Sequence, residues 1–78
     1  MTLEKHRLSE VRREELRALS MAARRLWEKA GTLPRDSERR QELVATAAAV
    51  SRAVAVGDAV AASDALRKLA DRRTHRAG

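Results

Sequence analysis

Alanine dominates the middle of this 78-residue chain. Residues 43–62 are mostly alanine or larger aliphatic residues, and the only charged side chains among them are Arg52 and Asp58. Alanine loses no side-chain entropy when a helix forms, so this segment favours helix. Alanine also buries little apolar surface, and the chain has one Trp and no Phe or Tyr. The sequence therefore predicts helices that form readily around a thin hydrophobic core.

Apolar residues recur at helical spacing in three segments, at about residues 3–30, 36–56 and 58–73, and no segment shows the period of two that marks a strand. Steps of three and four residues, the pattern of a bundle seam, connect Leu16, Leu19, Ala23, Leu26, Ala30 and Leu33. The same steps connect Leu43, Ala47, Val50 and Val54, and then Ala59, Ala62, Leu66 and Leu69. We expect a single all-α domain, a small antiparallel three-helix bundle completed by self-association.

Glycine and proline mark the end of the first predicted helix. Gly31 is expected to adopt the left-handed conformation that commonly follows a helix, and Pro34 prevents the helix from continuing. The second helix begins near Asp36 or Ser37, and both residues are good N-caps. The sequence leaves the choice between these two residues open.

Gly57 and Asp58 predict a tight turn between the second and third helices. Glycine is preferred just after a helix and aspartate is preferred as an N-cap, so the two residues serve both helices. A turn this short makes the two helices antiparallel neighbours. The last residues, 74–78, are expected to fray, as chain ends commonly do.

The first predicted helix is too long for the rest of the chain. At a rise of 1.5 Å per residue it measures about 42 Å, whereas the third helix is barely half as long. One end of the first helix therefore either protrudes or packs against another copy of the chain. Arg12 and Glu15 lie in its apolar arc, where they form either a polar layer that specifies a partner or simply a solvent-exposed stretch.

The apolar face of the first helix is the predicted protein-binding site. Trp27 lies at the edge of this face; tryptophan is common at binding hot spots, but here we expect it to cap the thin core. The predicted binding residues are Leu16, Leu19, Leu26, Trp27, Arg12 and Glu15.

The chain is basic, with a formal net charge of +6, and much of the excess lies near its C-terminus. Such a segment suits the negative end of a helix dipole and is also a candidate for contact with nucleic-acid phosphates. This alternative site comprises Arg67, Lys68, Arg72, Arg73 and Arg76.

A second set of basic residues follows one stripe of the first helix: His6, Arg13, Arg17 and Arg24. Acidic residues flank this stripe, so it is interpreted as a solvated face of mixed charge. Two intrahelical pairs are expected there, Glu10–Arg13 and Glu14–Arg17.

No motif of the chain predicts catalysis. Cysteine is absent, and the two histidines, His6 and His75, lie far apart, so we expect no metal site and no cofactor. No glycine-rich phosphate loop is present. The chain has no secretory signal and its alanine-rich block is too polar to span a membrane, so a cytoplasmic protein is expected.

Taken together, these features predict a non-enzymatic helical module for protein–protein interaction or assembly. The expected partner is a second copy of the chain, as a homodimer, or a larger protein on which the chain docks as an adaptor or inhibitor. The alternative is a small nucleic-acid-binding protein that uses the basic C-terminal segment. No small-molecule substrate is implied.

Overall fold

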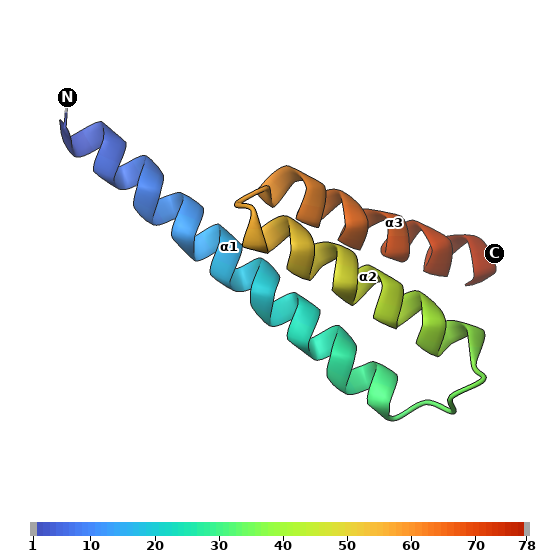
Figure 1. Cartoon of the computed structure of the whole chain (residues 1–78). Helices are drawn as coiled ribbons and strands as arrows, with labels where there is room; N and C mark the ends of the chain where they lie inside the picture. Colours follow the sequence, from blue (N-terminus) through green and yellow to red (C-terminus); the bar gives the residue numbers. More distant parts are fainter. Residues whose placement is uncertain (1, 78) are drawn as a thin grey trace.

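The computed structural model describes the backbone of residues 2–77 and the side chains of residues 10–72. It contains three α-helices, α1 (Thr2–Gly31), α2 (Glu38–Ala55) and α3 (Ala59–Ala77), and the described backbone has no strand. Successive helices run in opposite directions, so α3 returns along the direction of α1 (Figure 1). The predicted all-α fold with three helical segments is confirmed.

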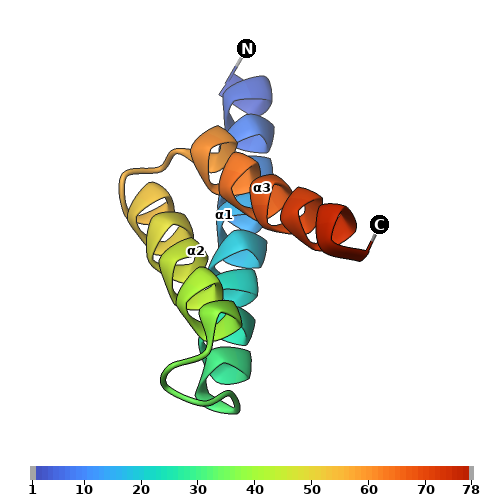
Figure 2. The ribbon, with the colours of Figure 1, turned by 90° about the vertical axis from the view of Figure 1, so that its right-hand side faces the viewer.

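The second helix is the centre of the bundle. It packs against both α1 and α3, whereas α1 and α3 meet over a much smaller area. Figure 2 shows the reason, because α3 lies at an angle to α1 and its C-terminal end diverges from that helix. Neighbours in sequence are therefore the main neighbours in space.

Short-range hydrogen bonds define the turn between α2 and α3. Gly57 has a φ of 75°, which is the left-handed conformation that the sequence predicts. The amide of Gly57 donates to the Val54 carbonyl at 3.0 Å, and the amide of Asp58 donates to the Ala53 carbonyl at 2.8 Å, so the helix ends in a Schellman motif. The Asp58 carboxylate accepts from the Ala61 amide at 3.0 Å and caps α3.

The start of α2 resolves the choice between two candidate caps. Ser37 has extended backbone angles, and its hydroxyl accepts a hydrogen bond from the Arg40 amide at 3.3 Å. This is the N-cap arrangement, and it satisfies one of the free amides of the first helical turn. Ser37, not Asp36, is therefore the N-cap of α2.

The end of α1 differs from the prediction. Gly31 belongs to the helix, and Gly57 is the only glycine with a positive φ in the described backbone. The chain leaves α1 through i to i−3 bonds, from the Thr32 amide to Lys29 and from the Leu33 amide to Ala30. The Thr32 hydroxyl also donates to the Lys29 carbonyl at 2.7 Å. These bonds satisfy the terminal carbonyls, so a left-handed glycine is not required.

The third helix extends to Ala77, beyond the end predicted near Arg73. Residues 74–77, expected to fray, form the last turn of the helix. The segment has no glycine or proline before Gly78 to stop the helix, and cations are favoured at its C-terminal end.

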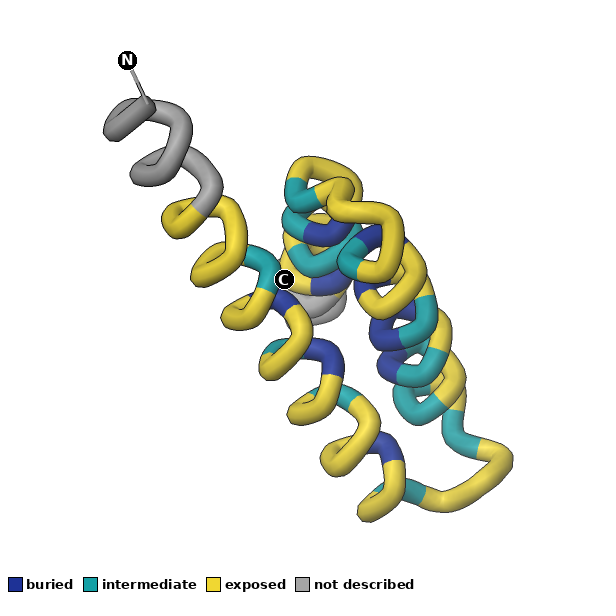
Figure 3. The backbone as a smooth tube through the Cα atoms, turned by 60° about the vertical axis from the view of Figure 1, so that its left-hand side comes forward, coloured by how far each residue is buried: buried dark blue, intermediate teal, exposed yellow. Residues whose placement is uncertain are grey.

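The core is thin and rich in alanine. Its buried apolar residues within the described range are Leu19, Ala23, Ala30, Leu43, Ala47, Val50, Ala53, Ala62 and Leu69. All of them lie on the predicted seams except Ala53, which is buried on α2 beside the predicted seam residue Val54. The largest fully buried side chains are Leu43 and Val50. Among the described residues of α1, Figure 3 shows the buried ones along the C-terminal half, on the side that faces the other helices. Small side chains let the helix backbones approach closely, but they remove little apolar surface from water.

The molecule is elongated, with principal extents of 52 × 26 × 15 Å. Its radius of gyration is 14.8 Å, whereas a compact domain of this length has about 11.5 Å. The difference comes from the N-terminal half of α1, which continues alone past the α2–α3 turn (Figure 1). Of the two sequence-based possibilities for this helix end, the single chain shows protrusion.

Candidate protein-interaction surface

The described part of the protruding half of α1 is exposed throughout. We call residues 2–15 the arm, because among the described side chains of α1 burial begins with the half-buried Leu16 and becomes complete at Leu19. In the described part of the arm, every side chain is exposed. Val11 is the apolar residue of that part, and 61% of its surface is accessible. A helix with an apolar residue this exposed has a surface available for a partner.

Arg12 and Glu15 extend the buried line of α1 into the arm. Arg12 precedes Leu19 by seven residues, which is two helical turns, and Glu15 precedes it by four. Both side chains are exposed, and neither forms an ion pair with another side chain in the range 10–72. In the single chain this part of the arm is therefore a solvated stretch.

The predicted leucines of the site serve the fold of the single chain. Leu19 is buried in one cluster with Val50 and Ala62, and Leu26 packs beside the second cluster, formed by Ala30, Leu43 and Leu69. Leu16 is half-buried at the point where the arm begins. Substitution of Leu19 therefore tests the stability of the bundle before it tests any interface.

The sequence predicts that Trp27 caps the core, and this prediction was wrong. Its side chain lies on the surface, with 45% of its area accessible. The buried residues nearest to it on α1 are the alanines Ala23 and Ala30, and Trp27 lies about 60° round the helix from Ala30. Alanines hold the neighbouring helix close, so the bulky indole remains outside the seam. It is available for binding, as the hot-spot interpretation requires.

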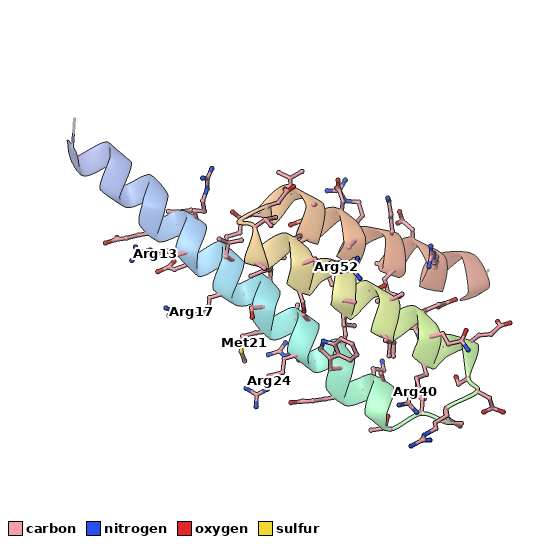
Figure 4. The ribbon with its side chains drawn as sticks, in the orientation of Figure 1. Arg13, Arg17, Met21, Arg24, Arg40 and Arg52 are labelled. Carbon is pink, nitrogen blue, oxygen red and sulfur yellow. The ribbon has the colours of Figure 1, made fainter. Side chains whose placement is uncertain are left out.

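A stripe of basic residues and one methionine runs along the outer edge of α1, away from the bundle (Figure 4). It contains Arg13, Arg17, Met21 and Arg24, and Arg24 pairs with Glu28 at 3.5 Å. The two expected pairs, Glu10–Arg13 and Glu14–Arg17, are not formed. These side chains are exposed, and water competes well for surface ions. That part of the prediction was wrong.

The basic residues of α3 do not share one direction. Arg67 and Lys68 are consecutive, so they point about 100° apart around the helix. Arg67 lies 3.9 Å from Asp64, which balances its charge, while Lys68 and Arg72, one helical turn apart, both line a groove beside α2. Arg73 and Arg76 lie outside the described side chains.

A shallow groove lies between α2 and α3, and no pattern described above for the sequence predicts it. Its volume is about 450 Å³, and it is lined by Ala45, Thr46, Ala49, Ala61, Asp64, Ala65, Lys68, Leu69 and Arg72. The floor is mainly alanine, because small residues on the flanks of both helices leave the space between them unfilled. Small exposed residues on two adjacent helix flanks are the signal that predicts such a groove.

Other kinds of site find no support within the described residues. No group of three or more His, Asp or Glu side chains in the described range is placed to hold a metal ion. None of the three helices, as far as they are described, has the length and hydropathy needed to cross a membrane. No protein-family model, curated protein or solved structure matches the chain.

Proposed function

We propose that this protein is a non-enzymatic helical module for protein–protein interaction, and that it assembles with itself through the arm. The observation that carries the proposal is the continuation of α1 beyond the bundle with Val11 exposed. An amphipathic helix gains most of its stability from the surface on which its apolar face packs. For the described part of the arm, the single chain provides no such surface, and a second copy would.

The composition of the core supports the same proposal. Five of its nine buried apolar residues are alanines, so the bundle removes little apolar area from water. A domain of this size is commonly marginal in stability. Association stabilises any folded state that the unfolded chain does not share. Self-assembly would therefore contribute what the core lacks.

The test is the molar mass in solution across a range of concentrations, measured by sedimentation equilibrium. The wild-type protein should associate, and Val11→Asp should remain monomeric, because a buried carboxylate opposes association. Both proteins should have the same helical circular dichroism, since Val11 is exposed in the single chain.

Met21→Asp is the matched control. Met21 is 48% exposed on the outer edge of α1, away from the bundle, and its replacement should leave the mass unchanged. A wild-type protein that stays monomeric at every concentration would contradict the proposal, as would Val11→Asp associating as well as the wild type.

The alternative, nucleic-acid binding through the C-terminal basic residues, has less support. Binding to a phosphate backbone requires several cations on one face. Among the described cations, only Lys68 and Arg72 share one side of α3, and Asp64 lines the same groove. Arg67 points elsewhere and has Asp64 as an acidic neighbour at 3.9 Å. A duplex titration at low salt tests this alternative directly. A complex that weakens steeply with added salt would favour it over self-assembly.

A further inference from the structure

The charges of residues 10–17, where the arm joins the bundle, form a pattern that reads the same in reverse with every sign exchanged. Taken from a midpoint between Arg13 and Glu14, each charged residue of the range 10–17 has its opposite at the same distance on the other side. The matched pairs are Arg13 with Glu14, Arg12 with Glu15, and Glu10 with Arg17. The remaining pair, Val11 with Leu16, is apolar on both sides.

We infer that two copies of the chain cross antiparallel at this midpoint, so that Arg12 of each copy lies opposite Glu15 of the other. The inference rests on the self-assembly proposed above and adds its orientation and its specifying contacts. A two-fold axis makes residue i meet residue j while j meets i, so an antiparallel pair would set unlike charges opposite one another. A parallel, in-register pair would set Arg12 against Arg12 and Glu15 against Glu15.

One face of the arm suits this contact better than the other. Glu10, Arg13, Glu14 and Arg17 occupy the side turned away from the bundle, and that side is charged throughout. Arg12 and Glu15 share the opposite side with Val11 and the half-buried Leu16, so this side combines charge complementarity with apolar area. An interface needs an apolar centre, and charged residues give it specificity.

The bundle limits how the two helices can meet. Because α2 and α3 cover this side of α1 from Leu16 onward, the second copy cannot run beside the full length of α1. A crossing near −50°, the most common class of helix packing, keeps the contact local to the midpoint.

The crossing would also place the second copy beside exposed apolar residues of the bundle. The α2–α3 turn lies beside the middle of α1 (Figure 1), and it is flanked by Val56, 79% accessible, and Val60, 73% accessible. A helix that passes the midpoint on the bundle side reaches this end of the bundle. The arm of one copy would then cover the two exposed valines of the other.

Charge reversal tests the register. Arg12→Glu alone, or Glu15→Arg alone, sets like charges opposite each other twice per dimer and should weaken dimerisation by about tenfold or more. An equimolar mixture of the two variants should recover wild-type affinity, because one chain then has acidic side chains at both positions and the other has basic side chains at both. Sedimentation equilibrium measures both effects, and circular dichroism checks that each variant is folded.

The neighbouring residues supply matched controls. Arg13→Glu and Glu14→Arg make the same charge changes on the outer side of the arm, so dimerisation should change by less than about threefold. If Arg13→Glu weakens dimerisation as much as Arg12→Glu does, or if the mixture does not recover, the inferred contact is wrong. Should the wild type dimerise while all four variants match it, the register fails but self-assembly stands. Should the wild type stay monomeric, both fail.

A spin label tests the orientation independently. The chain has no cysteine, so Lys29→Cys provides a single attachment point on the exposed side of α1. In the antiparallel crossing the two labels should lie about 40 Å apart, because each is roughly 15 residues from the axis on opposite sides. A parallel pair with the same crossing angle places them at roughly 20–30 Å, and that result would overturn the inference.

Discussion

Gly31 and Gly57 both lie at helix ends, yet the backbone uses them differently. Gly57 has a φ of 75°, a conformation that L-residues rarely adopt, whereas Gly31 is an ordinary helical residue. Neither has an atom within 4 Å of where a Cβ would lie. An alanine at either position therefore meets no steric clash, and backbone conformation alone decides its effect.

Replacing each glycine with alanine should shift the free energy of unfolding in opposite directions. Gly57→Ala should destabilise the protein by about 1–2 kcal/mol, because alanine is strained in the left-handed region. Gly31→Ala should be neutral or stabilising by up to about 1 kcal/mol, because alanine restricts the unfolded chain and favours helix. Urea denaturation followed by circular dichroism measures both. Equal effects would show that the two backbone conformations do not differ as described.

At this scale, sequence reasoning succeeds where a residue acts through its immediate neighbours. The Gly57–Asp58 turn depends on local hydrogen bonds, so the residue types predict it directly. The position of Trp27 depends on how closely α1 approaches α2, and that distance is set by alanines on both helices. The absent Glu10–Arg13 pair depends on competition with water, which spacing alone does not reveal.

Among the three helices, α2 is the one where a change in packing should reduce stability the most. It is the helix that contacts both others, and its Leu43, Ala47 and Val50 are at most 1% exposed. Apart from Ala53, the buried apolar residues of the described range lie on the seams that sequence periodicity predicts. Periodicity succeeds best on α1 and α3, because each of them packs mainly against α2. The central helix has two neighbours, so its buried surface also includes Thr46 and Ala53. Periodicity does not predict the groove between α2 and α3, because a groove depends on the separation of two helices and not on residue spacing within one helix.

The same substitution on two helices should separate core from surface. Val50→Ala removes a fully buried side chain from α2 and should destabilise the protein by about 2–3 kcal/mol, combining lost transfer energy with a residual cavity. Val60→Ala, at a residue 73% exposed on α3, should change stability by less than about 0.5 kcal/mol in the monomer. Thermal unfolding at low protein concentration measures both. A large effect of Val60→Ala there would mean that Val60 is buried within the single chain.

For the molecule as a whole, the arm and the thin core have the same consequence, which is that the single chain buries little apolar surface. The chain places about half of its longest helix outside its own bundle and fills the bundle with small side chains. The sequence predicts the imbalance in helix lengths and leaves open whether the surplus protrudes. The proposed interface lies beyond sequence reasoning on one chain, because its other half would belong to a second copy.

Stability should therefore depend on protein concentration. If folding and dimerisation are coupled, the midpoint of thermal unfolding should rise by about 4 °C for each tenfold increase in concentration. Val11→Asp should lose most of this dependence while it keeps its helical signal. A wild-type midpoint that is independent of concentration from micromolar to millimolar would exclude coupled folding and dimerisation in that range.

The elongated shape has a practical consequence for any measurement of size. A molecule of 52 × 26 × 15 Å experiences more friction than a sphere of equal mass. It therefore elutes early from a gel-filtration column, where the hydrodynamic radius governs migration. On a column calibrated with globular standards, a single chain would have an apparent molar mass above its true mass, because the protruding helix enlarges its hydrodynamic radius.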